Sequence, residues 1–237
     1  MQLLPGIYQL SGSLAGLGGD QILGPWDECN MYLIDSGSSC ILIDAGNGEN
    51  IDIIFKRMEM WGLDPNKIST LFLTHAHWDH AGGARLFKDR GVKILSSKET
   101  ADSVASADHR CAGFLYHKEM IPVTVDRIVG DREVVTVDAL EFEALHLPGH
   151  TLGCMAYLLT FNDQRILFSG DVIGTLGWGD FGWDGSVDFD KQRYIASLFK
   201  LQGIPFDVLL PGHGMGSYTD PVKRVNISLN QALIRWR

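Results

Sequence analysis

The decapeptide Thr74-His75-Ala76-His77-Trp78-Asp79-His80-Ala81-Gly82-Gly83 is the most informative stretch of this sequence. It places three histidines and a carboxylate in six consecutive positions, directly after the apolar run Ile68-Ser69-Thr70-Leu71-Phe72-Leu73. A short run of this kind predicts a buried strand, and the glycines permit a tight turn into a helix. We therefore expect the polar cluster where a strand ends and a loop begins. Imidazole and carboxylate groups are ligands of zinc-type ions, so the stretch predicts a metal site.

Three later segments share this layout, in which a polar residue follows an apolar strand and stands beside glycine. They are Pro148-Gly149-His150, Ser169-Gly170-Asp171 and Pro211-Gly212-His213. Glycine permits positive φ, and Pro-Gly fixes a turn, so each side chain is held near its strand end. Taken singly, His150, Asp171 and His213 could be ordinary turn residues. Their shared layout favours the interpretation that all three join the first cluster as metal ligands.

Apolar periodicity predicts a chain of mixed α and β structure. Residues 29–35 and 39–44 should form an antiparallel hairpin, and further strands are expected at residues 68–73, 92–96, 123–125, 133–137, 140–147, 155–161 and 165–169. Helices are expected at residues 51–61, 81–90, 97–107, 189–201 and 221–237. Two packed sheets with helices outside would bury these elements. The candidate pocket loops are residues 16–27, 108–120 and 174–185.

The composition describes a globular protein and argues against some partners. Hydrophobic residues make up 45% of the chain and the formal net charge is -9, which disfavours nucleic acid or an anionic membrane as partner. No apolar run approaches the ~18 residues of a membrane helix, and no signal peptide is evident at the N-terminus. The four cysteines form no CxxC pair, which favours a reduced, cytoplasmic protein with free thiols. A small-molecule substrate is the expected partner, and a homodimer is allowed.

The seven polar residues together resemble the ligand set of the metallo-β-lactamase fold superfamily, in the same order and over nearly the whole chain. The resemblance implies an α/β (α+β) fold, a four-layer αβ/βα sandwich of two mixed β-sheets flanked by helices, as a single domain over residues 1–237. It also implies a site for two metal ions. By position, His75, His77 and His150 would hold the first ion, Asp79, His80 and His213 the second, and Asp171 would bridge them.

Such a site has a definite chemistry. Two divalent cations ~3.5–4 Å apart can turn a shared water into hydroxide near neutral pH and polarise a carbonyl oxygen. We therefore expect a metal-dependent hydrolase that cleaves an ester, thioester, lactone or amide-type bond in a small molecule. The expected cofactors are two zinc ions, with iron or manganese as alternatives. Asp79 is the expected catalytic residue, because a carboxylate there could orient the nucleophile or carry its proton to the leaving group.

Two other functions fit part of the pattern. Persulfide dioxygenases resemble this motif, have a cysteine where Cys154 stands, and hold one iron at the positions of His75, His150 and Asp171. The Pro-Gly-His-Gly sequence around His213 favours the hydrolytic branch instead. The second alternative is a metal-bound sensor or binding protein without turnover, although every ligand position is filled.

Other branches of the superfamily depart from this sequence. Glyoxalase II enzymes have histidine at the position of Ala76 and a helical C-terminal glutathione-binding region, for which we expect no room after His213. Flavodiiron-type oxygen reductases carry glutamate at the position of His77 and add a flavin domain. RNA-processing members add a large extra domain.

Aromatic residues near the motifs are candidates for a substrate pocket, because such sites are lined mainly by apolar and aromatic groups. They are Trp26, Trp78, Trp178, Phe181 and Trp183. Trp78 lies inside the metal motif, whereas the others could equally be core or interface residues. Asp44, at a predicted strand end, is either a hydrogen-bond acceptor for a metal-binding histidine or an ordinary turn residue. His109, His117 and His146 are interpreted as structural or solvated.

Overall fold

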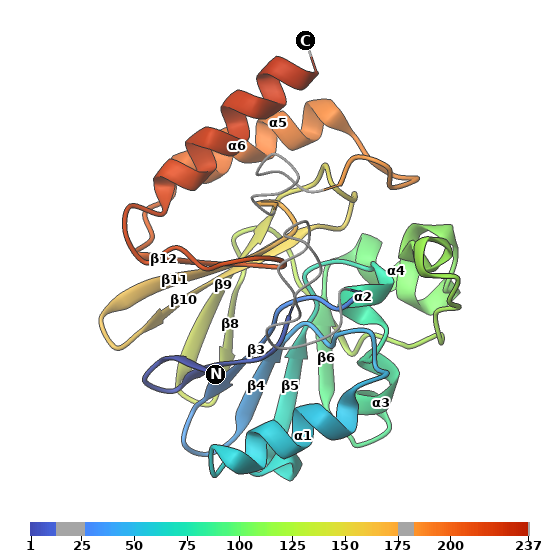
Figure 1. Ribbon diagram of the computed structural model, residues 1–237, viewed down its shortest axis with the longest axis vertical. Coiled ribbons are helices and arrows are strands. Elements are labelled where there is room, and N and C mark those ends of the chain that lie inside the picture. Colours follow the sequence, from blue (N-terminus) through green and yellow to red (C-terminus); the bar gives the residue numbers. More distant parts are fainter. Residues whose placement is uncertain (13–26, 175–182, 237) are drawn as a thin grey trace.

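The computed structural model describes residues 1–12, 27–174 and 183–236, and two mixed β-sheets form the centre of this part of the chain (Figure 1). The first sheet has the strand order β1 (Gln2–Leu4), β2 (Ile7–Ser11), β3 (Met31–Asp35), β4 (Cys40–Ile43), β5 (Ile68–Phe72), β6 (Lys93–Ser96) and β7 (Arg127–Ile128). The second has the order β12 (Val208–Pro211), β11 (Gln164–Gly170), β10 (Met155–Phe161), β9 (Leu140–His146) and β8 (Val134–Val137). Each sheet combines antiparallel pairs with parallel ones, such as β4 with β5 and β11 with β12.

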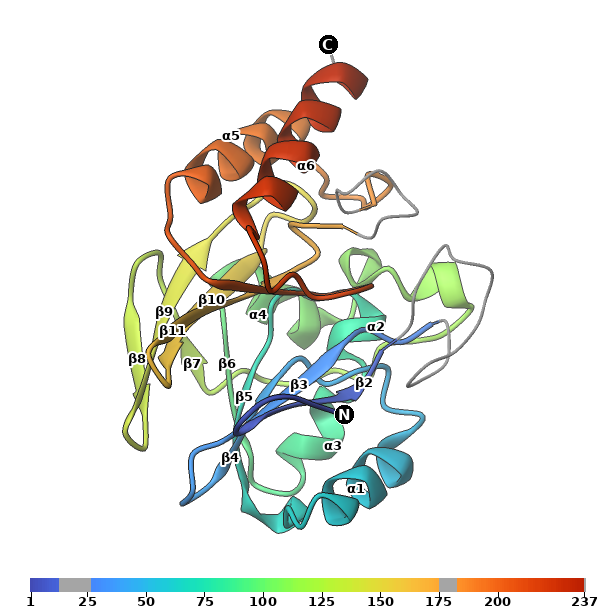
Figure 2. The same cartoon turned by 60° about the vertical axis from the view of Figure 1, so that its left-hand side comes forward.

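Helices cover the outer face of each sheet, as Figure 2 shows. The first sheet packs against α1 (Ile51–Met60), α2 (Trp78–Ala81), α3 (Ala84–Lys88) and α4 (Lys98–Ser106), and the second against α5 (Lys191–Gln202) and α6 (Val222–Arg235). The predicted four-layer αβ/βα sandwich is confirmed. Among the described residues, no helix has both the length and the apolar character needed to cross a membrane.

Strands buried on both faces hold the layers together. In β3, Tyr32 and Ile34 belong to the core between the sheets, whereas Met31 and Leu33 belong to the core under the helices. This division follows from the alternation of side chains along a strand. The inter-sheet core includes Phe72 of β5, whose ring centroid lies 4.8 Å from that of Phe142 in β9. The strand ends that carry the polar motifs are therefore held by packing on both faces of each sheet.

Most predicted elements are confirmed, including the hairpin β3–β4 and the helices α1, α4, α5 and α6. The helix predicted at residues 81–90 is wrong in its extent, because helical structure already begins at Trp78 and is interrupted at Gly82 and Gly83. A Cβ atom on Gly83 would lie 2.3 Å from the carbonyl oxygen of Ala45. The two glycines thus allow the metal motif to pack directly against the turn that follows β4.

Three further differences concern strands and loops. The strand predicted at residues 123–125 is wrong, since Val123 packs in the core under the helices and donates its N–H to Val104 in α4. The edge strand β7 comes a few residues later. The N-terminal strands β1 and β2 were not predicted. Residues 108–120, expected to form a loop, contain the short 3-10 helices η2 (His109–Cys111) and η3 (Gly113–Tyr116).

Candidate metal centre

Three buried histidines converge to form the first group of candidate ligands. His75 and His77 follow β5 of the first sheet, and His150 lies between β9 and β10 of the second. Nε2 of His150 lies 3.3 Å from Nε2 of His75 and 3.0 Å from Nδ1 of His77. The three side chains expose at most 4% of their surface. The predicted first set is thus brought together from two sheets.

A second group lies beside the first and consists of Asp79 and His80 in α2 and His213 after β12. Nε2 of His213 lies 3.0 Å from Oδ2 of Asp79 and 3.2 Å from Nε2 of His80. His213 is the most exposed of the three, with 14% of its side-chain surface accessible. These are the residues predicted for the second ion.

Asp171, which follows β11, lies between the two groups. Its Oδ1 is 3.3 Å from Nε2 of His80, and its Oδ2 is 3.6 Å from Nε2 of both His150 and His213. The carboxylate therefore faces both groups, as a bridging ligand would. Asp171 Oδ1 is buried and has no hydrogen-bond partner among the residues that the structure describes.

Each candidate histidine has an inner ring nitrogen, which faces the other candidate ligands, and an outer ring nitrogen, which faces away from them. In four of the five histidines, the outer nitrogen is hydrogen-bonded to a specific partner. His75 Nδ1 donates to Thr74 Oγ1, which itself donates to Asp44, and His80 Nδ1 donates to Asp44 Oδ2 at 2.8 Å. Two further bonds complete the set: His77 Nε2 donates to Ser186 Oγ at 3.2 Å, and His150 Nδ1 donates to the carbonyl of Trp183 at 2.8 Å. Such partners fix the tautomer and the orientation of metal-binding imidazoles.

This arrangement fits divalent cations. Because each outer nitrogen carries the proton of a neutral ring, the inner nitrogens of His75, His77 and His150 present lone pairs to one another at close range. A cation between them would remove that conflict, and a second cation beside His80 would satisfy the orphaned Oδ1 of Asp171. Imidazole nitrogen with carboxylate oxygen is a donor set that suits zinc and its neighbours among the transition metals.

Asp44 occupies a central position behind the site. Its Oδ1 accepts from the backbone N–H of Thr74 at 2.7 Å, and its Oδ2 accepts from the Thr74 hydroxyl and from His80. The sequence left two interpretations of Asp44 open, and these contacts favour the role of acceptor for a metal-binding histidine. Through Thr74 it connects His75 of the first group to His80 of the second.

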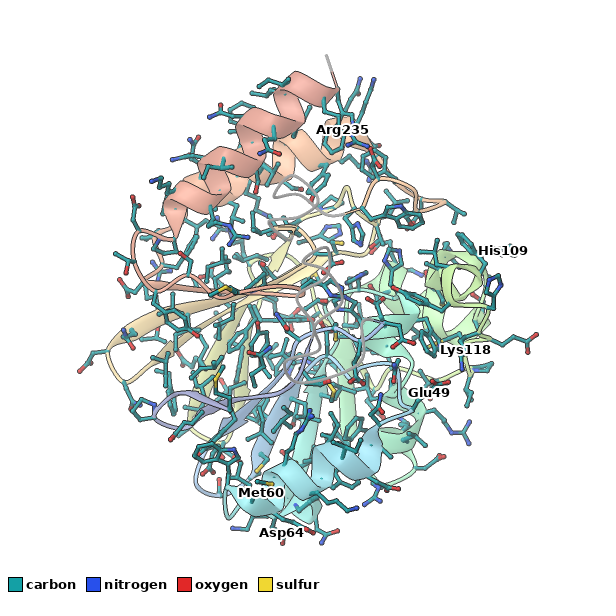
Figure 3. All side chains as sticks on the ribbon, viewed as in Figure 1. Glu49, Met60, Asp64, His109, Lys118 and Arg235 are labelled. Carbon is teal, nitrogen blue, oxygen red and sulfur yellow. The ribbon has the colours of Figure 1, made fainter. Side chains whose placement is uncertain are left out.

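Replacing Asp44 with asparagine should weaken metal binding roughly 10- to 100-fold, the range found for such partners of metal ligands. An amide N–H in place of Oδ2 would face the N–H of His80, so the ring would lose its acceptor. Equilibrium dialysis against a chelator measures the affinity. Asp64→Asn, on the surface beyond α1, is the matched control (Figure 3). Unchanged affinity in Asp44→Asn would remove Asp44 from the centre.

Electrostatics separate the two groups. Burial, reinforced by the neighbouring histidines, lowers the pKa of His75 well below its usual value, and burial lowers that of His77 to about 3. In the second group burial acts in the same direction, but the nearby carboxylates of Asp171, Asp79 and Asp44 raise the pKa of His80 well above its usual value. Asp171 and Asp79 likewise raise the pKa of His213. The histidines of the first group are therefore favoured in their neutral form, whereas the shifts in the second group favour the protonated form.

The two groups should therefore differ in proton release when metal binds. A cation must displace protons from His80 and His213 but finds His75 and His77 already neutral. Affinity at the second group should rise with pH until the raised pKa values of His80 and His213 are passed, and affinity at the first group should change less over the same pH range. Calorimetric titration in buffers of different ionisation enthalpy counts the protons at each step. Equal proton release at both steps would contradict this assignment of charge.

The predicted pocket residues have different outcomes. Trp26, Trp178 and Phe181 lie outside the described residues. Trp183 lies at the first group, with its ring centroid 6.1 Å from that of His77 and its carbonyl on His150. Trp78 is only 4% exposed and belongs to the core under the helices, so contact with a substrate stays a prediction for it.

Two residues at the site were not predicted. Ser186 holds His77 and donates its own proton to Asp188 at 2.7 Å. Tyr116 of η3 packs on Trp78, with ring centroids 5.1 Å apart, and its side chain hydrogen-bonds that of Asp79. Neither stands beside a recognisable motif. By contrast, His146 belongs to β9 and bonds the carbonyl of Leu152, and His109 lies at the outer edge of the molecule, as expected for residues outside the site (Figure 3).

Comparison with known proteins is consistent with this geometry. The family model of the metallo-beta-lactamase superfamily matches residues 24–213. The chain belongs to this superfamily. The hydroxyacylglutathione hydrolase GloC of Haemophilus influenzae is 28% identical over 86% of this chain and 92% of its own length. An atrochrysone carboxyl ACP thioesterase of Aspergillus fumigatus is 30% identical over 78% of this chain, which spans 50% of that protein.

A solved structure shows that the fold of the superfamily is shared as well. A metallo-beta-lactamase of Cronobacter sakazakii superimposes with a TM-score of 0.77 over 100% of this chain and 95% of its own, at 18% sequence identity. The family match and the hydrolase relatives together identify the chain as a hydrolase of the metallo-beta-lactamase superfamily, as predicted. Members of the superfamily bind divalent metals, typically zinc, and the two groups of candidate ligands correspond to that property.

Proposed function

We propose that this protein hydrolyses an acyl bond in a small molecule, with a water activated by two divalent cations. An ester, thioester, lactone or amide-type bond fits this chemistry, and we favour the thioester. The observation that supports two cations is the pair of ligand groups that Asp171 faces from both sides. Support for a thioester comes from two relatives, a hydroxyacylglutathione hydrolase and an acyl carrier protein thioesterase. The match covers 92% of the length of the hydroxyacylglutathione hydrolase. The expected lack of room after His213 therefore no longer argues against a glutathione thioester as substrate.

The cations and the Asp79 carboxylate would have different roles in the proposed hydrolysis. When bound, two such cations would acidify a shared water and polarise the substrate carbonyl. Burial would raise the pKa of Asp79, but His80 and His213 lower it to about 2. The Asp79 carboxylate therefore stays ionised and accepts a hydrogen bond, which suits it to orient the nucleophile rather than to act as a general acid. Its side-chain contact with Tyr116 limits the rotation of that carboxylate.

The alternative of a one-iron dioxygenase has less support. Its cysteine signature depends on Cys154, which is 1% exposed and accepts a hydrogen bond from the backbone N–H of Thr151. Burial raises the pKa of this thiol to about 12, which is typical of an inert structural cysteine. The convergence of Asp79, His80 and His213 also supplies a second metal position that a single iron would not need.

Metal content and substrate specificity test the proposal together. Metal-free protein is reloaded with zinc, manganese or iron, and the bound ions are counted by elemental analysis. We expect two ions per chain, and hydrolysis of hydroxyacylglutathione or a related thioester faster than that of the matched oxygen ester, a lactone or a β-lactam. Rapid oxygen uptake with glutathione persulfide and a single bound iron would overturn the proposal in favour of the dioxygenase. Two tightly bound ions without turnover on the whole panel would favour the sensor.

A further inference from the structure

His213 differs from the other candidate ligands in how its ring is held. Its Nδ1 is buried and has no hydrogen-bond partner among the described residues, whereas the outer nitrogens of the other four histidines are all bonded. On that outer side no side chain holds the His213 ring, so its position depends on the inner contact with Asp79 and on the backbone that carries it. This backbone belongs to the loop that leaves β12 at Pro211.

One side chain from the opposite sheet holds that loop on both sides of His213. Asn30, immediately before β3, donates from Nδ2 to the carbonyl oxygens of Pro211 and Gly214, at 2.9 Å each. Its backbone N–H donates to the carbonyl oxygen of Gly212 at 2.7 Å. Three carbonyl groups around His213 are thus bonded to a single residue of the first sheet.

The amide of Asn30 is itself fixed in orientation. Oδ1 of Asn30 accepts from Nε2 of Gln9 at 2.7 Å, which directs Nδ2 to the two loop carbonyls. Asn30 is only 1% exposed, and a Cβ atom on Gly12 would lie 2.0 Å from its Oδ1. A buried amide whose donors and acceptor are all satisfied is a rigid element of structure.

The residue before Asn30 contacts the other two members of the second group. The backbone N–H of Cys29 donates to the carbonyl oxygen of Asp79 at 3.3 Å, and its Sγ lies within 4.8 Å of a ring nitrogen of His80. The dipeptide Cys29-Asn30 therefore contacts Asp79, His80 and the loop residues on both sides of His213. The outer nitrogens of the first group are held elsewhere, by Thr74, Ser186 and Trp183.

We propose that Asn30 is a positioning residue for the second metal ion: it sets the location of His213 by clamping the carbonyls of Pro211, Gly212 and Gly214. This inference rests on the proposed two-metal function. It predicts that the two ions depend on different parts of the chain. Loss of the clamp weakens the second ion selectively, and the first ion keeps its affinity.

Asn30→Asp tests the clamp with little change in shape, because it replaces the two amide protons with an oxygen that faces two carbonyl oxygens. Zinc titration of the metal-free protein against a competing chelator should show affinity at the second step lowered about 10- to 100-fold and affinity at the first step unchanged. NMR of the ring nitrogens in protein with ¹⁵N-labelled histidine shows which ligand group binds zinc at each step. The signals of His80 and His213 should lose their zinc-induced shifts at concentrations that still shift those of the first group.

Matched variants separate positioning from general damage. Ser186→Ala removes the partner of His77 and should give the reverse pattern, with the first step weakened. Gln9→Ala removes only the bond that orients Asn30 and should weaken the second step less, so it also serves if Asn30→Asp does not fold. Tyr32→Phe removes the second donor to the Pro211 carbonyl, a bond of 2.7 Å, and should again affect only the second step.

The outcomes distinguish the clamp from the two-metal function itself. If the unaltered protein binds only one ion, the proposed function fails before any variant is compared. If it binds two ions and Asn30→Asp and Gln9→Ala retain full affinity at the second step, the clamp is wrong. Equal weakening of both steps would also overturn it, because that pattern indicates general loss of structure.

Discussion

Asp171→Asn should lose at least one of the two metal ions and reduce kcat/KM on the order of 1000-fold or more, since metal ions that stabilise developing charge contribute much of the rate enhancement in hydrolytic catalysis. Asparagine keeps the shape of the side chain and removes its charge. Two dications close together require an anionic ligand between them, and Asp171 is the carboxylate that faces both groups. Elemental analysis and kinetics on the same preparation measure both effects.

The chain offers a control on the same strand. Asp163 lies exposed in the turn just before β11, whereas Asp171 follows the other end of that strand. Asp163 has a φ of 60°, a conformation that asparagine also tolerates, so Asp163→Asn should leave metal content and kcat/KM unchanged. An Asp171→Asn protein with two ions and full activity would show that the bridging assignment is wrong.

The convergence of the candidate ligands was predictable because each one directly follows, or lies close behind, an apolar strand. Burial of their apolar side chains fixes these strands in the sheets, and this also fixes the position of the residues that directly follow them. His75 and His150 illustrate this point, since they come from different sheets and still meet at 3.3 Å between their Nε2 atoms. The sequence therefore located the candidate ligands without showing the contacts that support them.

Those supporting contacts join residues that are far apart in the chain. Ser186 stands 109 positions from His77, and Asn30 stands 181 positions from the Pro211 carbonyl. No local pattern marks a serine or an asparagine as the partner of a distant loop. Asp44 stands out in the sequence only because it ends a predicted strand, and its contact with His80 is what separates its two interpretations.

The error at residues 123–125 has a similar cause. Val123 and Val125 are apolar and β-branched, which favours a strand, but the same residues also suit a segment packed against a helix. Val123 is buried under α4 and bonds the carbonyl of Val104. A short apolar run shows that a segment is buried, but it does not show whether the segment packs against a helix or pairs with a neighbouring strand.

Gly212→Ala should lower kcat/KM on the order of 100-fold or more, because displacements of about 1 Å at a catalytic site have effects of that size. A Cβ atom at this position would lie 2.2 Å from Oδ1 of Asp171 and 2.8 Å from Cε1 of His80. Both side chains would have to move, and both face the second ion in the proposed centre. Zinc titration and kinetics of the variant should show the second ion weakened together with activity.

Gly203→Ala is the control for this substitution, since a Cβ atom there meets only the Lys200 carbonyl oxygen at 3.6 Å, an ordinary contact. Neither glycine has a positive φ, so the comparison isolates the steric effect of one methyl group at the site from any strain in the backbone. We expect Gly203→Ala to match the unaltered protein in metal content and kcat/KM. If Gly212→Ala also had the metal content and kcat/KM of the unaltered protein, Asp171 and His80 could be displaced without loss of function. The close packing of these two side chains would then not determine the position of the second metal ion.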